Sequence, residues 1–101
     1  MSDDTTVTVT DNSEEQRFEA HVDGELAGFA DYELREDVIT FTHTEVDSAF
    51  EGQGVGGALA RGALDHVRAS GGLSVVPECP FIARWVEKHP DYKALLAETS
   101  R

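Results

Sequence analysis

The sequence predicts an α+β fold with an antiparallel-dominated mixed sheet of about five strands, a central helix after a glycine-rich loop, and short C-terminal helices. Two observations predict this order. Apolar and polar residues alternate with period two in the first half of the chain, and apolar residues recur at helical spacing after the loop at residues 51–58. The 101 residues match the size of one domain. We therefore expect residues 1–101 to form a single domain, with residues 1–4 frayed.

Four stretches before the loop predict an antiparallel meander. Residues 7–9 alternate valine with threonine, which indicates a short first strand. Residues 18–22 and 26–34 flank an Asp-Gly pair at 23–24, and such a pair readily adopts the positive φ angles of a tight hairpin turn. Residues 38–46 are rich in β-branched side chains and favour an extended chain.

The second half of the chain predicts helices around one further strand. Apolar residues at helical spacing predict a helix from Val55 to the glycine pair at 71–72, because glycine readily forms a left-handed C-cap. Residues 73–77 predict a short buried strand. A helix over residues 80–88 follows, and a last helix is expected from residue 91 to about residue 98.

The chain is strongly acidic, with 20 Asp and Glu residues against 8 Lys and Arg residues and a net charge of −12. Binding to nucleic acid or anionic lipid requires a basic stripe, which the sequence lacks, so we expect neither nucleic acid nor a membrane as partner. Such a charge suits a chain adapted to high salt, and it equally suits ordinary solubility. The sequence has no run of about 18 apolar residues and no apolar leader segment, so the expected location is the cytoplasm.

Cys79 is the only cysteine, which excludes an intrachain disulfide and a cysteine cluster for zinc. His, Cys and carboxylate residues show no recognised ligand spacing, so no metal is expected. The sequence leaves open whether the protein is a monomer or a homodimer.

The loop over residues 51–58 holds four glycines within six residues. A helix that begins in such a loop presents unpaired backbone N–H groups at the positive end of its dipole, which favours phosphate. Three interpretations compete: a turn without a ligand, a dinucleotide site that matches Gly-x-Gly-x-x-Gly at Gly52, Gly54 and Gly57, and an acyl-CoA site. Four glycines weaken a helix start, so a ligand-free turn needs another reason for them. The antiparallel strands before the loop disfavour a dinucleotide site, which belongs to a parallel βαβ unit.

Residues 46–59 resemble the acetyl-CoA signature of the GCN5-related N-acetyltransferase superfamily, [Arg/Gln]-x-x-Gly-x-[Gly/Ala]. Gly54 and Gly56 match this signature, whereas Glu51 stands where it has Arg or Gln. A second block, residues 76–92, contains the sequence VPECPFIARWVEKHPDY. This block resembles the minimal, single-domain branch of the superfamily, the YjdJ-type or NATD1-like acetyltransferases.

The resemblance, which covers roughly residues 15–96, implies a site for acetyl-CoA as co-substrate. It implies that the strand over residues 38–46 splays from the strand over residues 73–77 and that the pantetheine arm enters the gap. The backbone of Val46 would then polarise the thioester carbonyl. Because Glu51 departs from the signature, the pyrophosphate contacts are expected from the backbone alone. The residues implied for acetyl-CoA binding are Val46, Gln53, Gly54, Val55, Gly56 and Gly57.

Amine attack on a thioester needs a group that takes up a proton, and His43 and Glu45 are the candidates near Val46. Period-two alternation places both on one face of their strand, where they are also explained as polar positions of a sheet surface. Cys79 precedes Pro80, and proline prefers the first helical turn, so the thiol is expected at a helix N-cap. There it could accept the acetyl group or lie against the CoA sulfur, and a small buried side chain is the alternative.

Together these features predict an N-acetyltransferase that moves acetyl from acetyl-CoA to an amine of a small molecule or a protein. The main alternative is a non-catalytic acyl-CoA-binding or sensing module, and a nucleotide-binding interaction domain is a third. The acidic surface favours a cationic acceptor.

Overall fold

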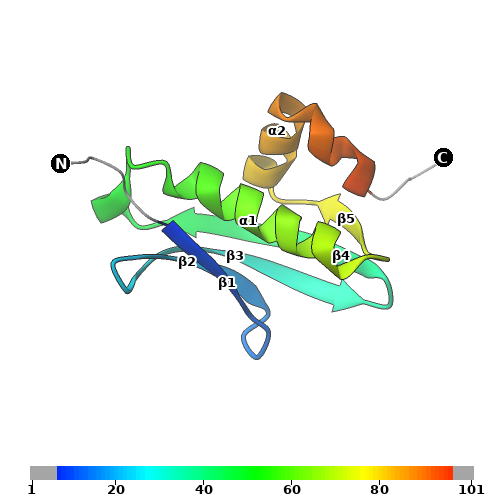
Figure 1. Cartoon of the computed structure of the whole chain (residues 1–101), viewed down its shortest axis with the longest axis horizontal. Helices are drawn as coiled ribbons and strands as arrows, with labels where there is room; N and C mark the ends of the chain where they lie inside the picture. Colours follow the sequence, from blue (N-terminus) through cyan, green and yellow to red (C-terminus); the bar gives the residue numbers. More distant parts are fainter. Residues whose placement is uncertain (1–6, 97–101) are drawn as a thin grey trace.

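The computed structural model describes residues 7–96, which form a five-stranded sheet with helices on one face (Figure 1). The strands follow one another across the sheet in the order β1-β2-β3-β4-β5. The expectations for residues 1–4 and for a helix end near residue 98 lie outside the described residues. The predicted α+β fold with a mixed, mostly antiparallel sheet is confirmed. The strands are β1 (Val7–Asn12), β2 (Arg17–Val22), β3 (Glu25–Arg35), β4 (Val38–Val46) and β5 (Ser74–Pro77).

Strands β1 to β4 pair antiparallel, whereas β5 is parallel to β4. The turn between β2 and β3 has the predicted geometry, with φ angles of 51° at Asp23 and 84° at Gly24. Positive φ at both central residues matches the right-handed twist of the flanking strands. A parallel pair requires a crossover connection, and helix α1 (Val55–Ser70) provides it between β4 and β5.

Helices α1 and α2 (Pro80–Lys88) lie over the same face of the sheet (Figure 1). Helix α1 approaches β1 so closely that a Cβ on Gly62 would lie 2.7 Å from the Cβ of Val9. Within residues 7–96 the opposite sheet face carries no helix. No helix in this part of the chain is long and apolar enough to cross a membrane.

A β-bulge in β4 exchanges the two faces of the strand. Phe41 is fully buried under the helices. Phe41 and His43 pair with consecutive residues of β3, which leaves Thr42 without a partner. One extra residue turns every later side chain to the other face. His43 and Glu45 therefore point to the helix-free face, although their spacing from Phe41 alone would place them in the core.

The last helix differs from the predicted one. The structure has a 3₁₀ helix, η2 (Pro90–Leu95), where a helix from residue 91 to about residue 98 was expected. Leu96 already has extended backbone angles, φ −67° and ψ 138°, and it forms a parallel bridge with Val75 of β5. Pairing with the outer edge of β5 ends the helix, because a bridged residue cannot continue the helical hydrogen bonds.

Candidate active site

Strands β4 and β5 separate at a fork, as the resemblance implied. They pair only over residues 38–41 and 74–77. Beyond Pro77 the chain leaves the sheet, and the N–H of Cys79 donates to the carbonyl of Phe41 at 2.9 Å. Residues 42–46 of β4 therefore have no strand on that side within the described residues, and their edge is free.

Val46 directs its backbone toward this free edge. The N–H of Asp47 donates to the carbonyl of Ala27 at 2.7 Å. In an antiparallel ladder, residues bonded in this way alternate with residues whose N–H and C=O point away from the partner strand. Thr44 and Val46 are the outward-pointing residues. An N–H in this position can stabilise negative charge that develops on a carbonyl oxygen during acyl transfer.

The loop before α1 offers a second set of donors. Gly54 caps the helix with φ 77°, and no atom lies within 4 Å of the position that a Cβ would take there. The N–H groups of residues 54–57 have no backbone acceptor among the described residues. Gln53, expected as a further donor, has its N–H bound to the carbonyl of Phe50 at 3.3 Å. The remaining donors lie at the positive end of α1, where a phosphate group is favoured.

Two glycines of the loop also face helix α2, and Gly56 is the one that the helix approaches closely. A Cβ on Gly56 would lie 2.8 Å from Cζ of Phe81, and a Cβ on Gly57 would lie 3.8 Å from Nε1 of Trp85. Helix α2 therefore approaches the first turn of α1 through two aromatic rings. The resemblance assigned Gly56 to phosphate binding, and the structure adds that a side chain at this position would displace the Phe81 ring.

Cys79 is the N-cap of α2, and Pro80 occupies the first turn. The residue is 4% exposed, and its Sγ donates a hydrogen bond to Oγ1 of Thr44 at 3.2 Å. The thiol accepts no hydrogen bond from the N–H groups that begin α2. Cys79 therefore lies against β4 at the fork, on the side covered by the helices.

His43 and Glu45 lie on the other side of β4. Nε2 of His43 is 3.3 Å from Oε2 of Glu45, and these side chains are 55% and 61% exposed. The His43 ring also lies beside Phe29, with centroids 6.2 Å apart. The structure thus brings His43 and Glu45 together, and the strand separates both of them from Cys79.

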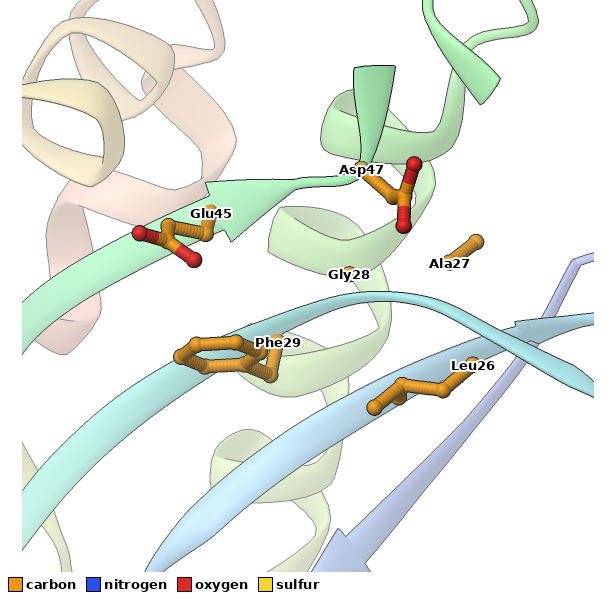
Figure 2. A pocket seen from close by; sticks show the side chains of 6 residues that line it. All are labelled: Leu26, Ala27, Gly28, Phe29, Glu45 and Asp47. Carbon is orange, nitrogen blue, oxygen red and sulfur yellow. The ribbon is translucent and has the colours of Figure 1, made fainter. Parts of the chain in front are cut away.

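A shallow pocket of about 110 Å³ opens beside Glu45 on the helix-free face. Figure 2 shows its side chains in front of the strands, with helix α1 passing behind them. Two carboxylates stand over an apolar floor in which Gly28 leaves the backbone bare. The bulge at Thr42 changes the register that the hairpin length alone would predict, so the pairing of Phe29 with Glu45 was not visible in the sequence. The lining residues are Leu26, Ala27, Gly28, Phe29, Glu45 and Asp47.

The Tyr92 hydroxyl is engaged in packing and is not free for proton transfer. It donates to Oδ1 of Asp65 at 2.7 Å. This hydrogen bond, together with burial, raises the pKa of Tyr92 above its ordinary value of 10.0. The phenol therefore keeps its proton and joins η2 to α1. Among residues 7–96, no group of three or more His, Cys or carboxylate side chains gathers in a way that could hold a metal ion.

Comparison with known structures shows the same fold in several acetyltransferases. A GCN5-like protein from Staphylococcus aureus, solved by NMR, aligns with a TM-score of 0.67 at 20% identity, over 99% of this chain and 95% of that one. The ribosomal-protein-S18-alanine N-acetyltransferase of Escherichia coli aligns with a TM-score of 0.54 at 21% identity, over 74% of this chain and 42% of that one. AAC(6')-Iy in complex with a CoA-based bisubstrate analogue aligns with a TM-score of 0.50 at 24% identity, over 84% and 63%.

The sequence profile of the GCN5-related N-acetyltransferase family matches residues 17–95. The search of curated proteins returned no match. The forked β4–β5 pair and the glycine-capped helix after β4 define the class of protein, an acetyl-transferase fold. The profile match then gives the particular family: the chain belongs to the GCN5-related N-acetyltransferases. Its place in the minimal branch of that family stays a prediction.

Proposed function

We propose that this protein transfers an acetyl group from acetyl-CoA to an amine. The observation that carries the proposal is the fork, where the free edge of β4 ends at Val46 and leads through η1 (Ser48–Phe50) into the phosphate-binding geometry of α1. Family membership supports it, since residues 17–95 match the profile of GCN5-related N-acetyltransferases. One structural neighbour binds a bisubstrate analogue built on CoA, which supports the same co-substrate.

The residues of the chain fit acetyl-CoA along this path. The N–H groups of residues 54–57 would hold the pyrophosphate, because they are unpaired and lie at the positive end of α1. The pantetheine arm would follow the free edge of residues 42–46 into the fork. The N–H of Val46 would then donate to the thioester oxygen and stabilise its charge in the transition state.

The amine would approach from the helix-free face, through the pocket beside Glu45. The carboxylates of Glu45 and Asp47 attract an ammonium group, and Phe29 and Leu26 provide an apolar surface for its carbon chain. Glu45 takes up the amine proton, directly or through a water molecule. The amine nitrogen forms a bond to the acetyl carbon, and the bond from that carbon to sulfur breaks. The nitrogen then loses its remaining extra proton as the amide forms, and this proton neutralises the CoA thiolate.

This arrangement supports direct transfer over a covalent intermediate on Cys79. A nucleophilic cysteine needs an adjacent base, and the partner of this thiol is the hydroxyl of Thr44. His43 and Glu45 lie on the opposite side of the strand. The prediction is that no acetyl-Cys79 forms when the protein is incubated with acetyl-CoA without an amine, as measured by intact-protein mass spectrometry. One acetyl group adds about 42 Da to the protein. An adduct of this mass that disappears on addition of amine would contradict direct transfer.

A two-stage experiment tests the function. Acetyl-CoA at about 100 times its Kd should stabilise the fold by about 2.7 kcal/mol in thermal denaturation. Release of the CoA thiol is then measured with a lysine peptide, a peptide with a free N-terminus and a small polyamine. Their tertiary-amine counterparts serve as controls, because they bind the same pocket and form no stable amide. Stabilisation without thiol release for any amine would identify a binding or sensing module, and absence of stabilisation would overturn CoA use altogether.

A further inference from the structure

A second pocket, of about 240 Å³, lies on the outer surface of α2 next to the glycine loop. It is lined by two aromatic and two cationic side chains at helical spacing, namely Phe81, Arg84, Trp85 and Lys88. Phe81 is 39% exposed, so one part of its ring faces solvent. The pocket therefore combines a flat apolar wall with two cations.

The two cations are unusual in so acidic a chain. The sequence has only 8 Lys and Arg residues against 20 Asp and Glu residues. Within the described residues, neither Arg84 nor Lys88 lies within 4.0 Å of a carboxylate. A third cation, Arg61 of α1, stacks over the Trp85 ring with its Cζ 5.6 Å from the ring centroid. Three of the scarce cations thus gather around one aromatic residue, where they favour an anion.

The pocket adjoins the donors of α1. Phe81 contacts Gly56 and Trp85 contacts Gly57, and both glycines belong to the first turn of α1. In CoA, the ribose that carries the 3′-phosphate is joined directly to the pyrophosphate. A pyrophosphate at the first turn therefore places this ribose and its phosphate one sugar unit away, within reach of α2.

We propose that this pocket binds the 3′-phosphoadenosine end of CoA, with Arg84 and Lys88 contacting the 3′-phosphate and the exposed part of Phe81 facing the adenine. The inference rests on the proposed use of acetyl-CoA and adds a specificity to it. The protein distinguishes CoA from 3′-dephospho-CoA, because only CoA carries the group that these cations attract. Neither the pyrophosphate nor the thioester contacts depend on this pocket.

The test compares binding of CoA and 3′-dephospho-CoA by calorimetry. Trp85 is the only tryptophan of the chain, so quenching of its fluorescence reports occupancy of the pocket directly. The variants are Arg84→Gln with Lys88→Gln, and a matched control, Arg35→Gln with Lys93→Gln. Both double variants remove two positive charges, and the control positions are exposed and do not line the pocket. All four side chains are exposed, so the fold should persist, and thermal denaturation verifies it.

The wild type and the control should bind CoA about tenfold more tightly than 3′-dephospho-CoA, a difference of about 1.4 kcal/mol. The Arg84→Gln, Lys88→Gln variant should bind both ligands with the affinity that the wild type has for 3′-dephospho-CoA. Equal binding of both ligands by the wild type, or an unchanged preference in this variant, would overturn the inference while leaving the proposed function intact. If neither CoA nor 3′-dephospho-CoA bound, the proposed function would be overturned, and the inference with it.

Discussion

At the scale of the residue, Thr42 decides what β4 presents on each face. Because it has no partner on β3, the side chains after it exchange faces. Glu45 thereby reaches the helix-free face, where it is 61% exposed. Without the bulge this carboxylate would point toward the core under α1, where burial of an unpaired charge is costly. One unpaired residue thus makes an acidic pocket on the helix-free face compatible with a stable core.

The two candidate bases can be separated by substitution. Glu45 lines the pocket on the helix-free face that we propose for the amine, and His43 does not. We expect Glu45→Gln to lower kcat about 100-fold, the scale of general-base catalysis, and to leave the Kd for acetyl-CoA unchanged. His43→Gln, the matched change on the same strand face, should lower kcat by less than about fivefold. Steady-state kinetics with the best amine measures both. If His43→Gln lowered kcat more than Glu45→Gln does, His43 would be the base instead of Glu45.

The proposed phosphate-binding role of Gly54 has a control at the other end of the same helix. Gly54 and Gly71 have φ angles of 77° and 70°, and neither has an atom within 4 Å of the Cβ position. Alanine should cost about 1 to 2 kcal/mol of stability at Gly54, which is left-handed with a ψ of 16°. It should cost more at Gly71, where a ψ of 140° lies outside the left-handed region and is less accessible to L residues. Only Gly54→Ala should weaken CoA binding, since its methyl group enters the space that the phosphate requires. If calorimetry gave equal CoA affinities for the two variants, the assignment of the phosphate to this loop would be wrong.

At the scale of the element, α1 connects the site with the rest of the fold. Its N-terminus carries the N–H groups that we propose as hydrogen-bond donors to phosphate, and its middle packs against β1 at Gly62. Its outer face binds η2, since Asp65 accepts from Tyr92, and the Cζ of Arg68 lies 4.5 Å from the centre of the Tyr92 ring. The position of α2 and η2, and with them the second pocket, thus depends on contacts along one helix.

The hydrogen bond from Tyr92 of η2 to Asp65 of α1 makes the stability of the fold sensitive to alkaline pH. The hydrogen bond to Asp65 and burial raise the pKa of Tyr92, so the folded state favours the protonated phenol. The contribution of the Tyr92 phenol to stability is fully present below pH 10.0, its ordinary pKa. This contribution is lost as the pH rises through the raised pKa of the folded state. At pH 7, Tyr92→Phe should cost about 1 kcal/mol for the lost hydrogen bond. Above pH 10 that difference should shrink.

Urea denaturation at pH 7 and at several values above pH 10 measures this difference. Tyr32, whose hydroxyl donates to Oδ1 of Asp11 at 2.7 Å, is a parallel case that joins β3 to β1. Burial, followed by this hydrogen bond, also raises the pKa of Tyr32. A Tyr32→Phe, Tyr92→Phe double variant should therefore lose least stability in alkali. If wild type and double variant lost stability in parallel, the two tyrosines would not be the titrating groups.

At the scale of the whole molecule, the two pockets carry opposite charges. The net charge of −12 comes from an acidic surface, while the cations near Trp85 lie beside the glycine loop. The pocket on the helix-free face is acidic, and the second pocket on the helix side is basic. Under the proposed function, a cationic acceptor and an anionic co-substrate would be attracted to opposite faces of the sheet.

Self-repulsion of this charge should make stability depend on salt. The Debye length falls from about 10 Å at 0.1 M salt to about 3 Å at 1 M, so screening should stabilise the fold. We expect a gain of about 1 kcal/mol, or about 4 to 8 °C in Tm, between these concentrations of NaCl. The variant Glu14→Lys, Glu33→Lys changes two exposed residues and brings the net charge of −12 to −8. It should gain less, and an equal gain would attribute the effect to general salting-out.

The sequence predicted most of the fold because its signals are local. Period-two alternation and the Asp-Gly turn located β2 and β3, and helical spacing after the glycines located α1. The N-cap position of Cys79 followed from Pro80 alone. A last helix was predicted, but its end at Leu95 was not, because the bridge from Leu96 to Val75 is a contact between distant segments.

The sequence by itself determined the order of the elements, the glycine-capped start of α1 and the family, all of which depend on neighbouring residues. Only the tertiary structure decided how the candidate residues are grouped. The bulge at Thr42 turned His43 and Glu45 away from Cys79, and helix packing gave Gly56 a second role against Phe81. The physical reason is that strand register and helix contacts are set by packing between segments far apart in the chain, and such packing leaves no local pattern in the sequence.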